Sequence, residues 1–139
     1  MKVDVNDTIM IVVGSGLVPE EKDRPLAYRL KSRIDPLGKS EYQRSVVVSD
    51  IWYLENILFQ TCSTVIIGGP GVNEASQHFF NKLPLIWTFE DMAFMQLDQE
   101  REIRVSLWGM NQAGTEMALD FFISEYLTRF LSLAWKENG

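Results

Sequence analysis

A repeated pairing of short apolar runs with polar or glycine-rich turns constrains the fold of this chain more than any other feature. Residues 8–13 (TIMIVV) end at a Gly-Ser-Gly turn, residues 45–49 (SVVVS) end at Asp50, and residues 64–67 (TVII) end at a turn with three glycines. Continuous apolar runs of this length, rich in β-branched residues, are typical of parallel strands covered on both faces. The sequence therefore predicts three buried parallel strands.

Helices are predicted between these strands. We expect the first to open near Asp23, with Asp23 as its N-cap and Pro25 in its first turn, where the missing N–H of proline costs nothing. A short helix over residues 51–59 and another over residues 72–83 follow the second and third strands. Alternation of strand and helix at this spacing indicates right-handed βαβ units and a mostly parallel sheet.

The second half of the chain departs from this alternation. Residues 85–89 (LIWTF) predict a fourth strand. Residues 94–98 and 104–108 alternate apolar with polar side chains, which is typical of a half-exposed antiparallel hairpin at a sheet edge. Residues 115–136 predict one helix of about six turns, with Thr115 as its N-cap.

Length and composition favour one globular domain over residues 1–139. Hydrophobic residues make up 46% of the chain, which is enough for a core and argues against disorder. The sequence therefore predicts an α/β fold: a three-layer sandwich with a mostly parallel sheet, Rossmann-like or flavodoxin-like, with an antiparallel edge hairpin and a long C-terminal helix.

Charge and cysteine content exclude several classes of partner. The 13 Lys and Arg against 19 Asp and Glu give a formal charge of −6 without a basic stripe, which argues against nucleic acid or an anionic membrane as partner. No apolar run reaches the ~18 residues of a membrane span, and the N-terminus lacks the pattern of a signal peptide. A single cysteine, Cys62, forms no intrachain disulfide, so a reducing, cytoplasmic location is expected.

The turns that follow the parallel strands are where a ligand is expected. In an open α/β sheet, ligands bind beyond the carboxyl ends of the strands, near the change in strand order. Here those turns are rich in glycine and polar residues, whereas the turns at the opposite edge are plainer. The candidate ligand-binding residues are therefore Gly14, Ser15, Gly16, Gly68, Gly69, Gly71, Asn73, Asn111 and Thr115.

The turn over residues 68–73 (GGPGVN) carries the strongest signal. Its glycines allow positive φ and close backbone approach, and the helix beyond it offers free N–H groups to a phosphate or carboxylate. The alternative is that the glycines only let a strand turn tightly into a helix. The turn lacks the Gly-Lys-Ser/Thr of a P-loop and the spacing of a dinucleotide-binding fingerprint, so no cofactor is identified. A small anionic metabolite or a nucleotide-like molecule is the expected ligand.

Two acidic residues at the same edge are candidates for catalysis. Asp50 directly follows a buried strand, and Glu74 follows the glycine-rich turn, so the pair fits acid/base chemistry or Mg²⁺ binding. The alternative is that they serve at helix N-termini or lie in solvent. As a nucleophile, Ser15 would need the one histidine, His78, which lies a turn inside a predicted helix, and Cys62 lies at the other end of the sheet. One Cys and one His also exclude a common zinc site.

The C-terminal helix suggests a partner. Three large apolar residues fall in or at the rim of the polar half of its helical wheel: Phe121, Leu131 and Trp135. Apolar clusters on a solvent face mark contacts with another subunit, so a homodimer through this helix is expected. The alternative is that the hairpin folds over these residues within the same chain.

Two short motifs also occur as a pair in other proteins. Residues 67–73 (IGGPGVN) and 109–118 (GMNQAGTEMA) resemble a Gly-Gly-Pro-x-Val-Asn and Gly-Thr-x-x-Ala pairing in some archaeal surface-layer proteins. The resemblance covers less than a quarter of the chain. It implies only that both motifs can serve one α/β architecture, and no site residue or activity is carried over from it.

Three hypotheses of function follow. The first, which we favour, is a binding module for a small anionic or nucleotide-like ligand at the carboxyl edge of the sheet. The second is a carboxylate- or Mg²⁺-dependent hydrolase or transferase that acts on a nucleotide-like substrate. The third is an oligomerisation domain without a small-molecule ligand, in which the glycine turns are structural.

Overall fold

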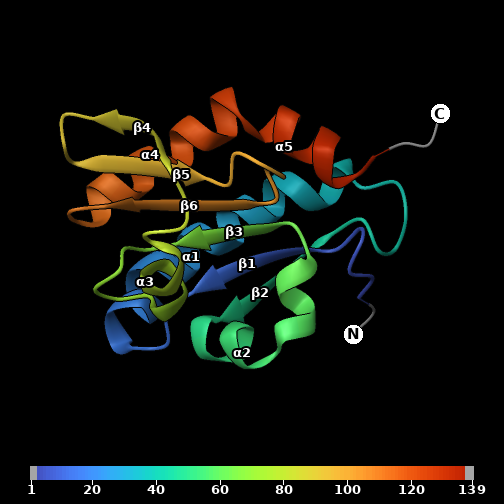
Figure 1. Cartoon of the computed structure of the whole chain (residues 1–139), viewed down its shortest axis with the longest axis horizontal. Coiled ribbons are helices and arrows are strands. Elements are labelled where there is room, and N and C mark those ends of the chain that lie inside the picture. Colours follow the sequence, from blue (N-terminus) through green and yellow to red (C-terminus); the bar gives the residue numbers. More distant parts are fainter. Residues whose placement is uncertain (1–2, 137–139) are drawn as a thin grey trace.

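A six-stranded sheet with the strand order β2-β1-β3-β6-β5-β4 forms the middle of the molecule (Figure 1). The computed structural model describes residues 3–136. Strands β2, β1, β3 and β6 run parallel, whereas β5 is antiparallel to both β6 and β4. The predicted α/β fold, with a mostly parallel sheet and an antiparallel edge, is thus confirmed. The strands are β1 (Ile9–Val13), β2 (Ser45–Ser49), β3 (Thr64–Ile67), β4 (Leu85–Phe89), β5 (Ala93–Leu97) and β6 (Arg104–Gly109).

The central strand β1 explains why the first apolar run has no polar alternation. All five of its residues are buried, because it pairs with β2 on one side and β3 on the other and has helices on both faces. Ile9, Ile11 and Val13 point into one core, and Met10 and Val12 point into the other. A strand covered on both faces needs an apolar residue at every position.

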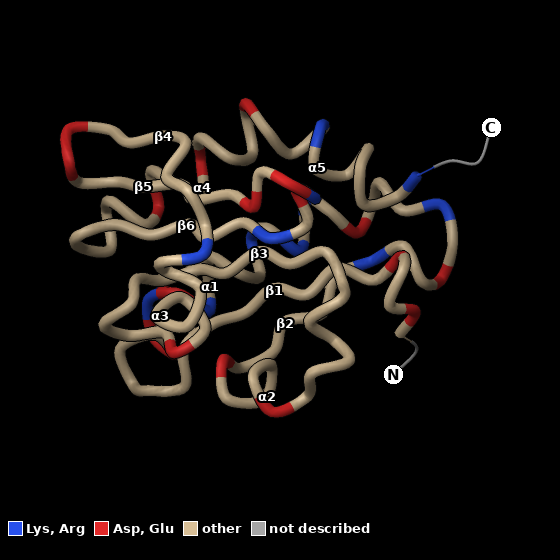
Figure 2. The backbone as a smooth tube through the Cα atoms, viewed as in Figure 1, with Lys and Arg blue, Asp and Glu red and all other residues tan. Residues whose placement is uncertain are grey.

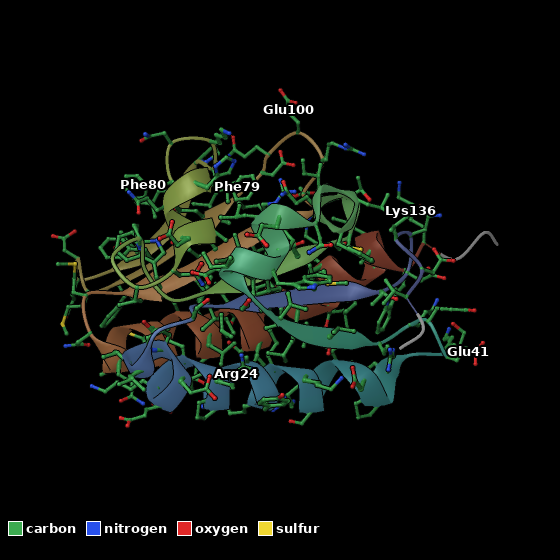
Figure 3. The ribbon with its side chains drawn as sticks, turned by 90° about the horizontal axis from the view of Figure 1, so that it is seen from below. Arg24, Glu41, Phe79, Phe80, Glu100 and Lys136 are labelled. Atoms are coloured by element: carbon green, nitrogen blue, oxygen red, sulfur yellow. The ribbon has the colours of Figure 1, made fainter. Side chains whose placement is uncertain are left out.

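Helices cover both faces of the sheet and give the predicted three layers (Figures 1 and 3). One core contains residues of α1 (Leu17–Ile34), α4 (Gln112–Glu125) and α5 (Leu127–Ala134). The other core lies under α2 (Asp50–Glu55) and α3 (Glu74–Phe79). Figure 3 shows Phe79 and Phe80 on the opposite side of the sheet from Arg24 of α1. Two short 3-10 helices, η1 (Asp35–Leu37) and η2 (Ile57–Thr61), follow α1 and α2.

The prediction for the start of α1 is wrong. The helix begins at Leu17, after Gly16 as N-cap, so Asp23 lies well inside it and is not the N-cap. Pro19 occupies the first turn, and Pro25 lies in the helix interior. Pro25 is exposed, so the carbonyl group that loses its N–H partner stays accessible to water and the helix continues.

The other helices also differ from their predicted bounds. Asn73 caps α3 by accepting hydrogen bonds from the next turn, which makes α3 shorter than residues 72–83. The predicted six-turn C-terminal helix is two helices, because Tyr126 leaves helical geometry at φ −133°. The Tyr126 hydroxyl donates to Glu102, and Arg129 of α5 pairs with the same carboxylate, so a contact with the β5–β6 connection fixes the break. The N-cap of α4 is Asn111 instead of Thr115.

The three residues expected at a dimer interface are covered within the chain. Phe121 stacks on Trp87 of β4, with ring centroids 4.1 Å apart and ring planes 6° apart. Leu131 and Trp135 are buried, and the indole N–H of Trp135 donates to the Asp7 carbonyl at 2.6 Å. The helical wheel assumed one straight helix with a solvent face, so the homodimer prediction loses the surface on which it was based.

The charged residues form no basic stripe over residues 3–136. Figure 2 shows Lys and Arg positions interspersed with Asp and Glu positions along the backbone. No helix in this part of the chain is long and apolar enough to span a bilayer.

Candidate functional site

The carboxyl ends of the four parallel strands meet at one end of the sheet, away from both ends of the described chain (Figure 1). Three pockets contain residues of the turn after β3. One of them lies against Phe80 and Trp108, and residues 70–72 line the other two. The α4-side pocket, of about 360 Å³, lies between this turn, α1 and the start of α4. The α3-side pocket, of about 470 Å³, lies between the same turn, the start of α1 and the start of α2.

Most of the predicted site residues line one of these pockets. Gly69, Gly71, Asn111 and Thr115 line the α4-side pocket. The α3-side pocket is lined by Gly71 and by five further predicted residues: Ser15, Gly16, Asp50, Asn73 and Glu74. The structure thus brings most of the predicted residues together around pockets at this edge of the sheet, although two of the glycines, discussed next, line neither of these two pockets.

Gly14 and Gly68 serve close packing. A Cβ atom at Gly14 would lie 2.0 Å from the Val72 carbonyl oxygen, because the turn after β3 closes over the end of β1. Gly68 has φ +110°, and a Cβ atom there would lie 2.7 Å from Oδ2 of Asp23. The crevice at the change in strand order is thus filled by the chain itself, and the two pockets lie on either side of it.

Asp50, the predicted catalytic acid, holds three segments together. It is 2% exposed, and its carboxylate accepts hydrogen bonds from the Ser15 hydroxyl, from the Ile51 N–H at 2.8 Å and from the Glu74 N–H at 2.7 Å. Those donors belong to the turns after β1, β2 and β3. The Glu74 side chain is exposed, so the structure brings its backbone, and not its carboxylate, to Asp50.

Asn73 also connects neighbouring segments, through hydrogen bonds that its side chain both donates and accepts. Its side-chain amide donates to the carbonyl groups of Val12 and Ile67, at 3.3 and 3.0 Å, and so joins the ends of β1 and β3. Its Oδ1 accepts from the N–H groups of Ala75 and Ser76 at the start of α3. Because these bonds anchor the end of the turn, residues 69–72 are held as a rigid wall between the two pockets.

The wall opposite this turn is the start of α4. Asn111 Oδ1 accepts from the Gly114 N–H, and Thr115 Oγ1 accepts from the Gly109 N–H. The N–H groups of Gln112 and Ala113 take part in no hydrogen bond within residues 3–136. Two donors of the first helical turn are thus left for a ligand or for water.

The residue that the sequence analysis missed is Asp23. It is 5% exposed and lines the α4-side pocket, and its carboxyl has no hydrogen-bond or ion-pair partner in the described part of the chain. Desolvation by burial raises the pKa of Asp23 to about 6, although the neighbouring Lys22 lowers it. A signal was present: once α1 begins at Leu17, Asp23 falls on the apolar stripe with Leu26 and Leu30.

The remaining reactive side chains are not arranged for catalysis. Cys62 is buried, and desolvation raises the pKa of its thiol to about 11, which keeps it protonated. His78 is exposed on α3, and burial with Lys82 nearby lowers its pKa. Between residues 3 and 136, no group of three His, Cys, Asp or Glu side chains is placed to hold a metal ion.

Comparison with known proteins assigns no family to this chain. No protein-family model matches it, and no curated protein matches it either. Its function therefore has to be inferred from the residues that line the two pockets.

Proposed function

We propose that this chain is a binding module for a small ligand with an anionic or hydrogen-bond-accepting end, of nucleotide-like size. The supporting observation is the α4-side pocket, which lies beyond the carboxyl ends of β3 and β6 between two glycine-containing turns. Its volume of about 360 Å³ falls within the range of small-molecule sites. It lies at the edge of the sheet where open α/β folds bind ligands, beside the change in strand order.

Backbone donors support an acceptor group on the ligand. Asn111 and Gln112 line the pocket at the start of the 14-residue helix α4, where the N–H groups of Gln112 and Ala113 lack partners within residues 3–136. The positive end of the helix dipole adds to the attraction for an anion. Facing them, the N–H groups of Gly69 and Gly71 are also free of hydrogen bonds in the described structure.

The pocket walls favour an apolar or aromatic body between the polar ends. Val18, Val72, Trp108 and Met110 line the pocket, and Val18, Val72 and Met110 are exposed around its mouth. Such a mixture of apolar walls with a few convergent polar groups is typical of ligand sites. It suits a nucleoside, a nucleotide or a similar aromatic metabolite better than a bare phosphate.

The enzyme hypothesis has less support. Both carboxylate oxygens of Asp50 accept hydrogen bonds from the protein. Glu74 contacts Asp50 through its backbone N–H, and its side chain is exposed. A carboxylate engaged in this way orders its surroundings and has little capacity left for proton transfer. Binding is therefore the function that the arrangement supports best.

A thermal-shift screen with a blocking variant tests the proposal. Gly71 lines both pockets, and a Cβ atom there meets nothing within 4 Å, so Gly71→Phe adds a ring that can obstruct either pocket, and Gly71→Ala is the matched control. The panel contains nucleosides, nucleotides, sugar phosphates and carboxylates. A ligand at about 100 times its Kd stabilises the fold by about 2.7 kcal/mol, which raises Tm by several degrees.

The expected result is a rise in Tm that Gly71→Ala retains and Gly71→Phe loses. A panel in which no compound changes Tm would contradict the proposal. A hit that binds Gly71→Phe as well as the natural chain would contradict it too, because the ligand would then lie outside the pocket.

A further inference from the structure

The second buried carboxylate of the site differs from the first in having no partner. Asp50 and Asp23 are buried to a similar extent, at 2% and 5% exposure. Asp50 accepts three hydrogen bonds, whereas the Asp23 carboxyl accepts none from residues 3–136. Asp23 is nearly buried as a residue, but its carboxyl oxygens keep some access to solvent at the pocket and are therefore open to a ligand. Buried or nearly buried carboxyls without a protein partner concentrate at functional sites.

Asp23 lies on the α4-side pocket and is held there by the fold. Its helix α1 packs against the sheet through Leu26, Ala27 and Leu30, which fixes the backbone position of Asp23 beside the pocket. Its Oδ2 lies in the space that the missing side chain of Gly68 leaves free. The turn after β3 thus has a glycine where any other residue would displace this carboxyl.

From this arrangement we propose that Asp23 is the recognition group of the pocket and selects ligands with a cationic nitrogen or an amidine-like N–H edge. The inference rests on the proposed function, because it concerns the ligand of that same pocket. A cation or a pair of N–H donors supplies the hydrogen bonds that the buried carboxylate lacks, and charge-assisted bonds of this kind are the strong ones. The ligand then carries its N–H donors at the Asp23 end and its acceptor at the α4 end.

Asp23 carries the only negative charge among the described residues that line the pocket, and the Lys22 ammonium beside it works against a cation only weakly, because solvent screens it. Among the described residues that line the pocket, Lys22 is the only other titratable group, and its side chain is exposed. The turn of residues 69–72 and the start of α4 contribute none. Because burial raises the pKa of Asp23 to about 6, the carboxyl is mostly ionised at neutral pH and mostly protonated well below it. Capture of a cation is therefore expected to weaken in acid.

Benzamidine and benzamide form a matched pair of probes, because they share size and shape and differ in charge and in one donor. Binding is measured by isothermal titration to the natural chain, to Asp23→Asn and to Glu21→Gln. Glu21 is the control, since it is an exposed carboxylate on the same helix and does not line the pocket. Asp23→Asn keeps the shape of the side chain and removes a charge that no described residue pairs with, so the fold is retained.

We expect benzamidine to bind the natural chain and Glu21→Gln alike, and to bind Asp23→Asn at least about tenfold more weakly. Between about pH 5 and about pH 7.5 its affinity for the natural chain rises about tenfold, following ionisation of Asp23, and that rise is absent in Asp23→Asn. Benzamide binds all three proteins weakly and without this pH dependence.

Equal binding of benzamidine to the natural chain and Asp23→Asn would overturn the inference, and so would equal binding of the two probes. No binding of benzamidine to the natural chain would overturn it as well. The Gly71→Phe variant separates these failures from failure of the proposed function. If a nucleotide or carboxylate from the screen is blocked by Gly71→Phe yet is indifferent to Asp23→Asn, the pocket binds ligands and only the role of Asp23 is wrong.

Discussion

The Cβ atom that any other residue would place at position 68 would lie 2.7 Å from Oδ2 of Asp23. Gly68 also has φ +110°, a conformation that L side chains rarely adopt. The Asp23 carboxyl therefore has its present position only because residue 68 has no side chain. Predictions about stability follow from this arrangement, from the hydrogen bonds of Asp50 and from the stacking of Phe121 on Trp87.

Gly68→Ala is expected to lower the free energy of unfolding by about 1–3 kcal/mol, because it adds backbone strain and a clash with the Asp23 carboxyl. Gly71→Ala is the control and should stay within about 0.5 kcal/mol, since it meets nothing within 4 Å. Urea denaturation measures both. In an Asp23→Ala background the cost of Gly68→Ala should fall, because the clash is gone. An unchanged cost there would show that only the backbone angle matters.

Stability should depend on pH through Asp23. Its pKa is about 6 in the folded chain and about 3.8 when unfolded, so the folded state binds the proton more tightly. The stability gained by protonation is present below pH 3.8 and is lost as pH rises through 6. At neutral pH the ionised carboxyl costs at most about 3 kcal/mol.

At neutral pH, Asp23→Asn is therefore expected to have a free energy of unfolding about 1–3 kcal/mol higher than that of the natural chain, and so to unfold at a higher urea concentration. The difference should narrow as pH falls toward 3.8. Comparing the two proteins at each pH cancels the contribution of His78 and other groups. Identical midpoints across the whole range would mean that the Asp23 carboxyl is not desolvated.

Asp50→Ala is expected to lower the free energy of unfolding by about 3 kcal/mol or more, because three donors lose a buried acceptor. Ser15→Ala removes a single donor and should cost about 1 kcal/mol. Amide hydrogen exchange at Glu74 provides a local measurement, since its N–H donates to Asp50. A stable Asp50→Ala variant that has lost ligand binding would instead assign the carboxylate to the ligand.

Phe121→Ala is expected to lower the free energy of unfolding by about 1–3 kcal/mol, less than at a fully buried site, because Phe121 is half-buried. Trp87→Ala should couple with it, with an interaction energy of about 0.5–1.5 kcal/mol for the stacked rings. A double-mutant cycle in urea measures this coupling. Loss of a dimer by size exclusion, without loss of stability, would instead place Phe121 in an interface between two copies of the chain.

The sheet could be predicted because its signal is local. Strands β1 and β3 are short runs of apolar and β-branched residues, and both are fully buried. The half-exposed edge hairpin expected from residues 94–98 and 104–108 is wrong: β5 and β6 are mostly buried inside the sheet, and the exposed edge strand is β4. The helix ends could not be predicted as well. Pro25 fits both a first turn and an exposed interior position, and the break at Tyr126 depends on Glu102, which lies 24 residues away. Tertiary contacts of this kind leave no mark on periodicity.

The candidate site, like the fold, could be predicted only in part from the sequence. That the turns after the parallel strands, including residues 68–73, lie together beside pockets could be predicted from the strand pattern and from their glycine and polar content. The roles of Gly14 and Asn73 could not be predicted, because Gly14 meets Val72 and Asn73 joins β1 to β3 only in the folded chain. Asp23 was not predicted as a site residue because the helix start was predicted wrongly, which assigned Asp23 to the N-cap instead of the apolar stripe.

One wall of the α4-side pocket is fastened to the outer hairpin of the sheet. The Met92 carbonyl, in the connection between β4 and β5, accepts the Met110 N–H at 2.9 Å. The same carbonyl lies where a side chain at Gly114 would intrude, 2.2 Å from its Cβ. The connection between β4 and β5 is therefore in direct contact with the start of α4, which lines the pocket. A ligand that binds there is expected to slow hydrogen exchange at the Met110 N–H, so this amide would report occupancy from the hairpin side of the sheet.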